Sequence, residues 1–578
     1  MTPNTQLPLL HISDGWQSFF PDRGDESALA MAATLQAQLT GVVLPEFIVQ
    51  QRWFAAKGEQ IEHVVVSRQA IWKKKWLFLQ VQVSLPHAGT QTYSLPLALA
   101  WEKDGLEPLE ARQPDTLARI SQDGRQGILY DAFADETFCA ELLAAMRQQA
   151  NFPVTGGRLK FSASADFAQL AGDCSTPLPL QRATATSSNT TLLLGDRLFL
   201  KACRRLWVGI NPELEMGRFL TAAAPYRHIA PLAGALEFED TDGTPTTLVL
   251  VQGLVASQGD AWSHTLTSLS RFLVECRQQP EVMRARLDTC HEVVLRRLSA
   301  LGRRTGELHC ALATTSGDPA FDPQPITPAD LQRWAQQAGA EAAQTLDQLE
   351  RHLPHLARDQ QPKAQGLLME RPAVLAKIQA LLPSAVEAVI TRYHGDFHLG
   401  QVLLVNEDFV LIDFEGEPGR TLQQRRRKHS PLRDVAGMLR SFNYAANSAL
   451  TQAATGDAAS VGLLQPFVID WERRARIAFL AGYREAVSAC PAYPQDPQAA
   501  ASLLQLFELE KAFYELRYEL DNRPDWVHVP LGGLTALLLR EPLIEYQIVI
   551  PAHPRGISFG AKAGIQKIQG TGHRPPPV

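Results

Sequence analysis

The stretch that decides the fold spans residues 393–419 and reads YHGDFHLGQVLLVNEDFVLIDFEGEPG. Its first third holds Asp396 directly after a glycine, which permits an otherwise strained backbone in a tight loop. Its remainder predicts a hairpin, with strands at 401–405 and 409–413 joined by an Asn-Glu-Asp turn. Hairpin pairing would bring Asp413 back to the start of the first strand. The sequence therefore predicts that the two acidic segments form one site.

The residue types in this stretch suit phosphoryl transfer. A carboxylate at Asp396 can accept a hydroxyl proton or orient the hydroxyl for attack. Gln401 and Asp413 offer hard oxygen ligands of the kind that Mg²⁺ prefers, so they could share a cation beside that carboxylate. Each fragment alone occurs by chance in many turns and strands, but their order and spacing favour a function. A metal-dependent hydrolase is the competing chemistry, and the sequence lacks the several closely spaced His or carboxylate ligands typical of it.

A lysine on a strand supplies the second part of the pattern. The sequence contains no GxxxxGK(S/T) motif, which excludes the P-loop proteins. Strands are predicted at 190–194 and 197–202, joined by a Gly-Asp turn. Lys201, near the end of the second strand, lies where kinase-like folds carry their phosphate-binding lysine. On the helix that follows, Glu215 is the expected ion-pair partner and Glu213 is the less favoured one.

Composition bounds the class of protein. The chain has 578 residues, a hydrophobic fraction of 45% and a net charge of -6. This charge gives no reason to expect a nucleic-acid partner, and no apolar window is long enough to suggest a membrane span. Seven scattered cysteines without a CxxC pair fit reduced thiols rather than disulfides or a zinc site. The first 22 residues show no secretory leader, so the expected location is cytoplasmic.

The order of the predicted elements indicates an α+β fold. Runs typical of β-strands fill 51–101, and a buried strand is expected at 246–255. From residue 262 onward, leucines and alanines at helical spacing predominate. The helices predicted there span 262–315, 327–353, 367–383, 430–446, 464–490 and 500–521. The Gly- and Pro-rich tail is expected to be poorly ordered.

Several longer motifs accompany the 393–419 stretch. They include SPLRDVAGMLRSFNYAA at 430–446, EKAFYELRYELDNRPDWVHVPL at 510–531 and, earlier, QRWFAAKG at 51–58 and LFLKACRRLWVGINPELEMGRFL at 198–220. Together they resemble the maltokinases, a family of the aminoglycoside-phosphotransferase-like, protein-kinase-like superfamily. The resemblance implies a protein-kinase-like bilobal fold with a β-rich N-terminal cap, an intermediate ATP-binding lobe and a helical C-lobe. The expected bounds are 1–150 for the cap, 151–256 for the intermediate lobe, 257–541 for the C-lobe and 542–578 for the tail.

Members of this family phosphorylate maltose at C1 with ATP and Mg²⁺, giving maltose 1-phosphate for α-glucan (glycogen) synthesis. They are often fused to trehalose synthase or act beside it. The resemblance implies that Asp396 is the catalytic base and that Gln401 and Asp413 are the Mg²⁺ ligands. A glutamine at position 401, where the superfamily usually has Asn, matches the maltokinases rather than the antibiotic kinases. The residues expected to hold ATP are Lys201, Glu215, Ser188, Asn189, Thr190 and, as the hinge facing adenine, Gln252, Gly253 and Leu254.

Sugar recognition is expected in the 510–526 segment, which interleaves aromatics with acids and amides. Tyr514 and Tyr518 share one helical face, where an aromatic ring can cover a pyranose; packing of these rings in the core is the alternative. Asp434 is expected to brace the catalytic loop, and the basic run at 423–430 to be a solvated face. The candidates for contacting the sugar are His398, Glu415, Lys511, Tyr514, Glu515, Asn522 and Trp526.

Two other functions stay open. A maltokinase-like kinase for another sugar, such as glucosamine, would share these signatures. From a different class, the chain could be a catalytically silent partner module of trehalose synthase. The joint presence of Lys201, Asp396, Gln401 and Asp413 favours an active enzyme, because a pseudokinase normally lacks one of these residue types.

Overall fold

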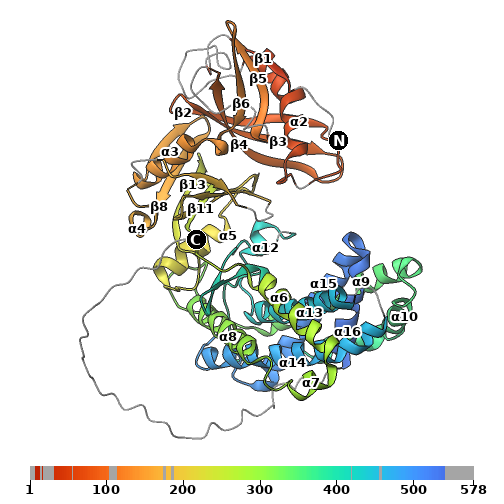
Figure 1. Ribbon diagram of the computed structural model, residues 1–578. Coiled ribbons are helices and arrows are strands. Elements are labelled where there is room, and N and C mark those ends of the chain that lie inside the picture. Colours follow the sequence, from red (N-terminus) through yellow and green to blue (C-terminus); the bar gives the residue numbers. More distant parts are fainter. Residues whose placement is uncertain are drawn as a thin grey trace, which may run out of the picture.

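The structure is a computed structural model that describes residues 7–12, 16, 32–54, 56–102, 114–173, 177–183, 188–417, 419–454 and 458–539. Figure 1 shows a β-rich unit at the top, a second β-rich unit below it and a lobe of helices at the bottom. The predicted α+β fold is confirmed. The predicted tail, 542–578, lies outside the described residues. Among the helices that the structure describes, none is long and apolar enough to cross a bilayer.

The first β-rich unit is a mostly antiparallel sheet with the strand order β1-β5-β6-β4-β3-β2. Its buried face packs on two short helices, where Leu44 and Ile48 join the same core as Leu95 and Leu97. The elements are β1 (Leu9–His11), α1 (Ala33–Gln38), α2 (Leu44–Gln50), β2 (His63–Trp72), β3 (Trp76–Leu85), β4 (Gly89–Trp101), β5 (Thr116–Gln122) and β6 (Arg125–Asp131).

The second β-rich unit is a sheet with the order β7-β8-β13-β14-β11-β10-β9. It shares a core with the first unit, because Trp72 of β2 stacks on Phe161 of β8 with ring centroids 5.5 Å apart. The elements are α3 (Glu136–Arg147), β7 (Asn151–Val154), β8 (Gly157–Ala163), α4 (Phe167–Ala171), β9 (Leu180–Arg182), β10 (Thr190–Leu194), β11 (Leu198–Ala202), β12 (Arg205–Leu206), α5 (Pro212–Arg218), β13 (Leu232–Asp240) and β14 (Pro245–Gly253).

A buried ion pair ties these two units together. Arg204, directly after β11, is fully buried and contacts the carboxylate of Asp131 at the end of β6. Its Nε donates to Thr190 Oγ1 at 2.8 Å, and its carbonyl accepts from the Ser94 N–H at 2.8 Å. Breaking such a buried pair typically costs about 3–5 kcal/mol. The pair therefore holds the first unit firmly against the strand that carries Lys201.

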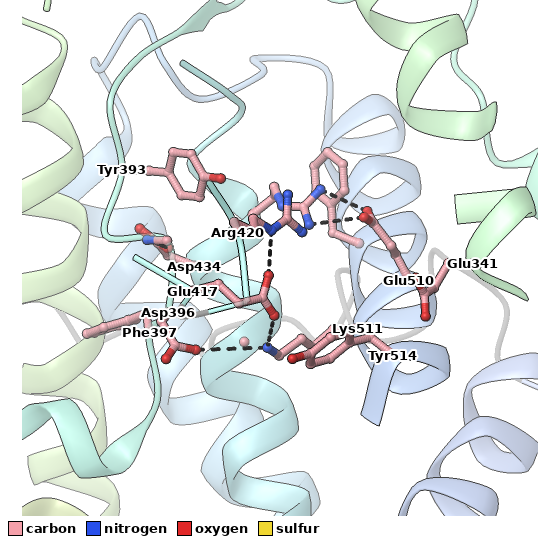
Figure 2. Close-up of a pocket in the computed structure, with 14 residues that line it drawn as sticks. Glu341, Tyr393, Asp396, Phe397, Glu417, Arg420, Asp434, Glu510, Lys511 and Tyr514 are labelled. Atoms are coloured by element: carbon pink, nitrogen blue, oxygen red, sulfur yellow. Dashed lines mark hydrogen bonds and ion pairs between the residues drawn. The ribbon is translucent and has the colours of Figure 1, made fainter. Parts of the chain in front are cut away.

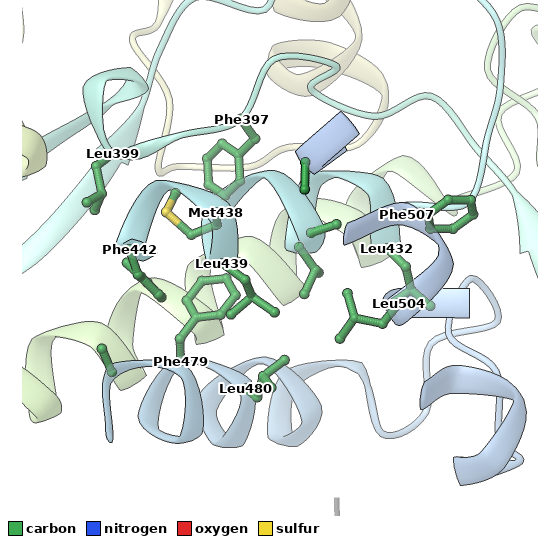
Figure 3. Close-up of a cluster of buried hydrophobic side chains, with 14 of the residues drawn as sticks. Phe397, Leu399, Leu432, Met438, Leu439, Phe442, Phe479, Leu480, Leu504 and Phe507 are labelled. Carbon is green, nitrogen blue, oxygen red and sulfur yellow. The ribbon is translucent and has the colours of Figure 1, made fainter. Parts of the chain in front are cut away.

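The helical lobe is organised around α13, whose buried residues extend over most of its length. Met438, Leu439 and Phe442 of this helix pack against Phe397 and Phe479 from neighbouring segments (Figure 3). The elements are α6 (Ala261–Gln278), α7 (Pro280–Ala285), α8 (Glu292–Leu312), β15 (Gln324–Pro325), α9 (Pro328–His352), α10 (Gln361–Met369), α11 (Arg371–Ala380), β16 (Val389–Ile390), β17 (Val402–Val405), β18 (Asp408–Leu411), α12 (Leu422–Arg425), α13 (Leu432–Ala454), α14 (Ala458–Val487), α15 (Pro497–Asn522) and α16 (His528–Leu539).

Most predicted elements are present, with one clear correction. The hairpin is confirmed, since Val402 pairs with Leu411 and Val405 with Asp408. The helical stretch expected over 262–315 is divided into three helices, α6, α7 and α8. The first break falls at Gln279, whose backbone (φ -138°, ψ 62°) leaves the helical region before Pro280 begins α7. A proline disfavours helical geometry in the residue before it, which explains the break.

Candidate active site

The loop that carries Asp396 is held by the helix behind it. Asp434, in the first turn of α13, accepts hydrogen bonds from the backbone N–H of His394 at 2.7 Å and of Gly395 at 2.9 Å. Its Oδ2 also lies 3.2 Å from His309 Nε2. Gly395 adopts φ 89°, and a Cβ there would meet the Cα of Gly416 at 3.2 Å. The prediction that Asp434 braces this loop is confirmed.

Asp396 opens onto the cleft and has a lysine nearby. Lys511 Nζ lies 4.0 Å from Asp396 Oδ1 and 3.3 Å from Glu417 Oε1 (Figure 2). Burial alone would lower the pKa of Lys511, but the carboxylates of Glu417 and Asp396 raise it, so this lysine stays charged. Burial would raise the pKa of Glu417, yet Lys511 and Arg420 outweigh it and lower the pKa to about 2. Lys511 therefore joins the loop of Asp396 to α15.

A cluster of carboxylates surrounds Lys201 on β11. Its Nζ lies 2.8 Å from Glu213 Oε2, 2.7 Å from Asp413 Oδ1 and 2.6 Å from Glu415 Oε1. Burial would lower the pKa of Lys201, but these three carboxylates raise it well above the ordinary value. Burial raises the pKa of Glu213 to about 7 although Lys201 opposes the shift. The cluster is thus a dense negative centre with one built-in cation.

Hairpin pairing completes this centre as the sequence predicts. Asp413 follows β18 with φ 66°, a left-handed conformation that turns its carboxylate out of the strand. Gln401 Nε2 donates to Asp413 Oδ2 at 3.0 Å, and the Ile412 N–H donates to the Gln401 carbonyl at 3.0 Å. Three carboxylates, of Glu213, Asp413 and Glu415, bring oxygen atoms within 4.8 Å of one another. All these donors are oxygens, and such a set fits a hard divalent cation.

The expected pairing of Lys201 with Glu215 is wrong. Glu213 takes that place and is 4% exposed, whereas Glu215 binds Arg392 Nη1 at 2.7 Å and Arg426 Nη2 at 2.6 Å. Two residues along an α-helix differ by about 200° around its axis, so only one of the two acids can face the sheet. Glu215 therefore lies outside the lysine site and links α5 to the helical lobe.

The other residues expected to hold ATP lie at the edge of this centre. Asn189 Nδ2 donates to Glu415 Oε1 at 3.3 Å, so it reaches across from β10 to the hairpin. The hydroxyl of Thr190 is turned away and accepts from Arg204, while Ser188 is exposed. At the expected hinge, which begins with Gln252, the N–H of Gly253 donates to Pro231 O and that of Leu254 to Arg197 O. Their assignment to ATP stays a prediction.

A cavity of about 440 Å³ opens beside Asp396 against α13 and α15. Five of the residues expected to contact a sugar line it: His398, Lys511, Tyr514, Glu515 and Trp526. Two do not and are corrected here. Glu415 belongs to the Lys201 cluster because the hairpin carries it there. Asn522, exposed at the end of α15, donates to the Tyr518 carbonyl one turn earlier.

The cavity also contains residues that the sequence reasoning missed. Glu519 follows Glu515 by four positions on the same face of α15, so helical spacing was a usable signal for it. Trp262, Ser441 and Tyr444 come from α6 and α13, and nothing in their local sequence marks them. These three residues line the cavity because α6 and α13 pack beside α15 in the folded chain.

The acids of the cavity are already paired within the chain. Arg440 Nη2 lies 2.8 Å from Glu515 Oε2, and Arg523 Nη2 lies 2.6 Å from Glu519 Oε1. His398 accepts from the Gly400 N–H through Nδ1, and burial lowers its pKa despite the nearby Asp396, so it remains neutral at pH 7. The cavity wall is therefore polar but close to electrically balanced.

Comparison with known proteins places the chain among sugar-kinase relatives. Residues 47–135 match the family model of the maltokinase N-terminal cap domain. A glucosamine kinase of Mycolicibacterium smegmatis is 24% identical over 358 residues, 61% of this chain and 78% of its own. A glucosamine kinase of Streptacidiphilus jiangxiensis is 26% identical over 361 residues, 61% of this chain and 72% of its own.

Solved structures agree at the level of the fold. A glucosamine kinase structure (crystal form B) aligns with a TM-score of 0.58 and 18% identity, covering 86% of this chain and 99% of that one. A glucosamine kinase in complex with glucosamine, ADP and inorganic phosphate aligns with a TM-score of 0.56 and 18% identity, with the same coverage. These structures show the kinase-like fold, and the cap-domain match at residues 47–135 confirms the resemblance to the maltokinases.

Proposed function

We propose that this chain, which carries a maltokinase-type cap on a kinase-like fold related to glucosamine kinases, is an ATP-dependent sugar kinase that phosphorylates maltose at its C1 hydroxyl. The observation that carries the proposal is the position of Asp396. This carboxylate lines the cavity beside α15, and its loop touches the hairpin that holds the Lys201 cluster. A hydroxyl in the cavity and a phosphate on the cluster would therefore meet at one carboxylate.

The Lys201 cluster supports binding of a nucleotide with a divalent cation. Lys201 would contact the phosphates of ATP, and the oxygens of Asp413 and Gln401 would hold Mg²⁺, with Glu415 as a further oxygen donor. When bound, the cation neutralises charge on the transferring group. Glu213 would keep the ammonium of Lys201 in place, because their 2.8 Å contact is buried.

The chemical step would use Asp396 as the base. Its carboxylate takes the proton of the C1 hydroxyl while the sugar oxygen forms a bond to the γ-phosphorus. The bond between that phosphorus and the bridging oxygen breaks, and ADP leaves with the electron pair. Asp434 holds the two backbone N–H groups before Asp396, so the base cannot swing away during transfer.

The charge of the cavity supports a neutral sugar. An aminosugar carries an ammonium group, which would need a carboxylate without a cation of its own. Glu515 and Glu519 are already bound to Arg440 and Arg523, as described above. Aromatic side chains of Tyr514 and Trp526 offer faces for pyranose rings, and a volume of about 440 Å³ falls in the usual range for ligand pockets.

Glucosamine is the second candidate substrate, and the names of the relatives favour it. A catalytically silent module beside trehalose synthase is the third reading. The close arrangement of Lys201, Gln401 and Asp413 argues against it, since a silent module has no need for a buried charge cluster. If maltose is the substrate, we expect a cytoplasmic enzyme that supplies α-glucan synthesis, with trehalose synthase as its partner.

The test is ADP release from MgATP with maltose, glucosamine, glucose, trehalose and kanamycin offered one at a time. Selective turnover of maltose would support the proposal. Turnover of glucosamine alone would keep the mechanism and replace the substrate. No turnover of any acceptor by a folded protein would favour the silent module.

A further inference from the structure

The basic run at 423–430 does not behave as the uniform solvated face that the sequence suggests. Arg426 binds Glu215, Lys428 donates to the carbonyl of Pro319 at 2.7 Å, and Arg427 is exposed. Arg425, at the end of α12, is half-buried and its stem lies against Gly416. Arg425 thus differs from the other basic residues of this run in its surroundings.

Packing on two glycines places Arg425 beside the loop that carries Asp396. A Cβ on Gly416 would meet Arg425 Cβ at 3.4 Å and Cγ at 3.5 Å, so the arginine stem packs on that glycine. Gly416 in turn lies against Gly395, the residue before Asp396. Arg425 Nε donates to the Arg420 carbonyl at 2.9 Å, which fixes the direction of the side chain. Only Gly416 therefore lies between the aliphatic part of Arg425 and Gly395, the residue before Asp396.

A second arginine approaches the same place from the opposite lobe. Arg205 of β12 lies 4.6 Å and Arg425 lies 5.7 Å from the ring centroid of Trp207, each measured from the guanidinium carbon. Within the described residues no carboxylate pairs with Arg205. Trp207 is 38% exposed in the loop between the lobes. Two like charges that share one indole repel each other, and an anion between the lobes would relieve the repulsion.

The electrostatic surroundings of Arg425 agree with this position. Burial lowers its pKa, and the charge of Arg205 lowers it further, while the carboxylates of Glu415, Asp396 and Asp413 act in the opposite direction. The arginine therefore interacts with the same acids that define the Lys201 centre.

We propose that Arg425 binds the terminal phosphate of ATP and stays with it as the phosphoryl group passes to the sugar. The inference rests on the proposed ATP-dependent function. A guanidinium presents parallel N–H donors that match phosphate oxygens, and it cannot lose its charge near neutral pH. The indole of Trp207, which follows β12, contacts the guanidinium of Arg425 through a cation–π interaction. Closure of the lobes on ATP would thus bring Arg425, Lys201 and the transferring group together.

The test compares two nucleotides that differ in the terminal phosphate. Dissociation constants for a non-hydrolysable imido analogue of ATP and for ADP, each with Mg²⁺, are measured by calorimetry on the full chain and its variants. Arg425→Gln should weaken the analogue about 10- to 100-fold and leave ADP nearly unchanged, as expected for loss of one charged contact. Arg427→Gln is the matched control, because it removes the same charge two residues away and should alter neither nucleotide.

A rescue experiment separates a chemical role from a structural one. Turnover of maltose by Arg425→Ala should rise when guanidinium chloride is added at millimolar concentration, and turnover by Arg427→Ala should not. Equal weakening of both nucleotides by Arg425→Gln, or the same loss in the Arg427 variant, would overturn the inference. A wild-type chain that turns over no sugar, yet shows the analogue-specific loss in Arg425→Gln, would sink the proposed sugar-kinase function and leave only the binding of the terminal phosphate by Arg425 standing.

Discussion

Replacing Glu213 and Glu215 in turn should separate catalysis from stability. Both acids lie in the first turn of α5, but the structure gives them different partners. Glu213→Gln removes a carboxylate 2.8 Å from Lys201, and Glu215→Gln removes one that binds both Arg392 and Arg426. The two variants carry the same change of charge and shape two residues apart, so each is the control for the other.

The magnitudes follow from these contacts. A hydrogen bond to a charged group contributes about 1.5–3 kcal/mol, so Glu213→Gln should lower kcat/KM for ATP about 10- to 100-fold. It should leave the unfolding temperature unchanged or higher, because the raised pKa of Glu213 means that its buried charge opposes folding. Glu215→Gln leaves the buried guanidinium of Arg392 without its carboxylate, at a cost of about 3 kcal/mol.

The assays are coupled ADP release at varied ATP and thermal unfolding of the purified variants at pH 7.5. Glu215→Gln should lower the unfolding midpoint by roughly 2–5 °C and keep kcat/KM within about twofold of wild type. A Glu215 variant that loses ATP affinity while the Glu213 variant does not would refute the reasoning and restore the pairing expected from the sequence.

Three further predictions concern the base, the cavity and pH. Asp396→Asn should keep the fold and reduce kcat with the accepted sugar about 10²–10⁴-fold, measured by ADP release; near-normal turnover would contradict its role as base. Trp526→Ala should raise KM for maltose about tenfold with little change in KM for ATP, whereas Asn522→Ala should change neither, since it lies outside the cavity. In the folded protein the pKa of Glu213 is about 7, whereas in the unfolded chain the ordinary value of 4.5 applies. The folded state therefore binds the proton more tightly, and the free energy of unfolding should fall as pH rises from 4.5 to 7. Denaturant titrations across that window should show a shallower fall in Glu213→Gln, and equal slopes in the two proteins would count against the raised pKa.

Local signals explain why the catalytic stretch could be predicted. A hairpin is defined by its own turn and strand residues, so the approach of Gln401 to Asp413 followed from strand pairing alone. The brace at Asp434 was also predictable, because its acid sits in a helix start behind a loop with free N–H groups. The hairpin depends on neighbours in sequence, whereas Asp434 lies 40 positions from His394 and reaches it because α13 packs behind the loop.

The errors have the opposite origin. Choosing between Glu213 and Glu215 requires the rotation of α5 about its axis, which the packing of that helix against β13 determines. Glu415 was expected to contact the sugar, yet its carboxylate lies 2.6 Å from Lys201 Nζ, a contact between segments more than 200 positions apart. The place of Trp262 in the cavity beside Asp396 could not be foreseen, since the two residues are 134 positions apart in the sequence.

The most direct test of the account is a competition in one vessel. Equal concentrations of maltose and glucosamine are incubated with limiting MgATP and the full chain, and the phosphorylated products are separated and identified by mass spectrometry. The balanced charge of the cavity predicts a phosphodisaccharide as the main product, absent with Asp396→Asn. Glucosamine phosphate as the main product would contradict the assignment of a neutral sugar.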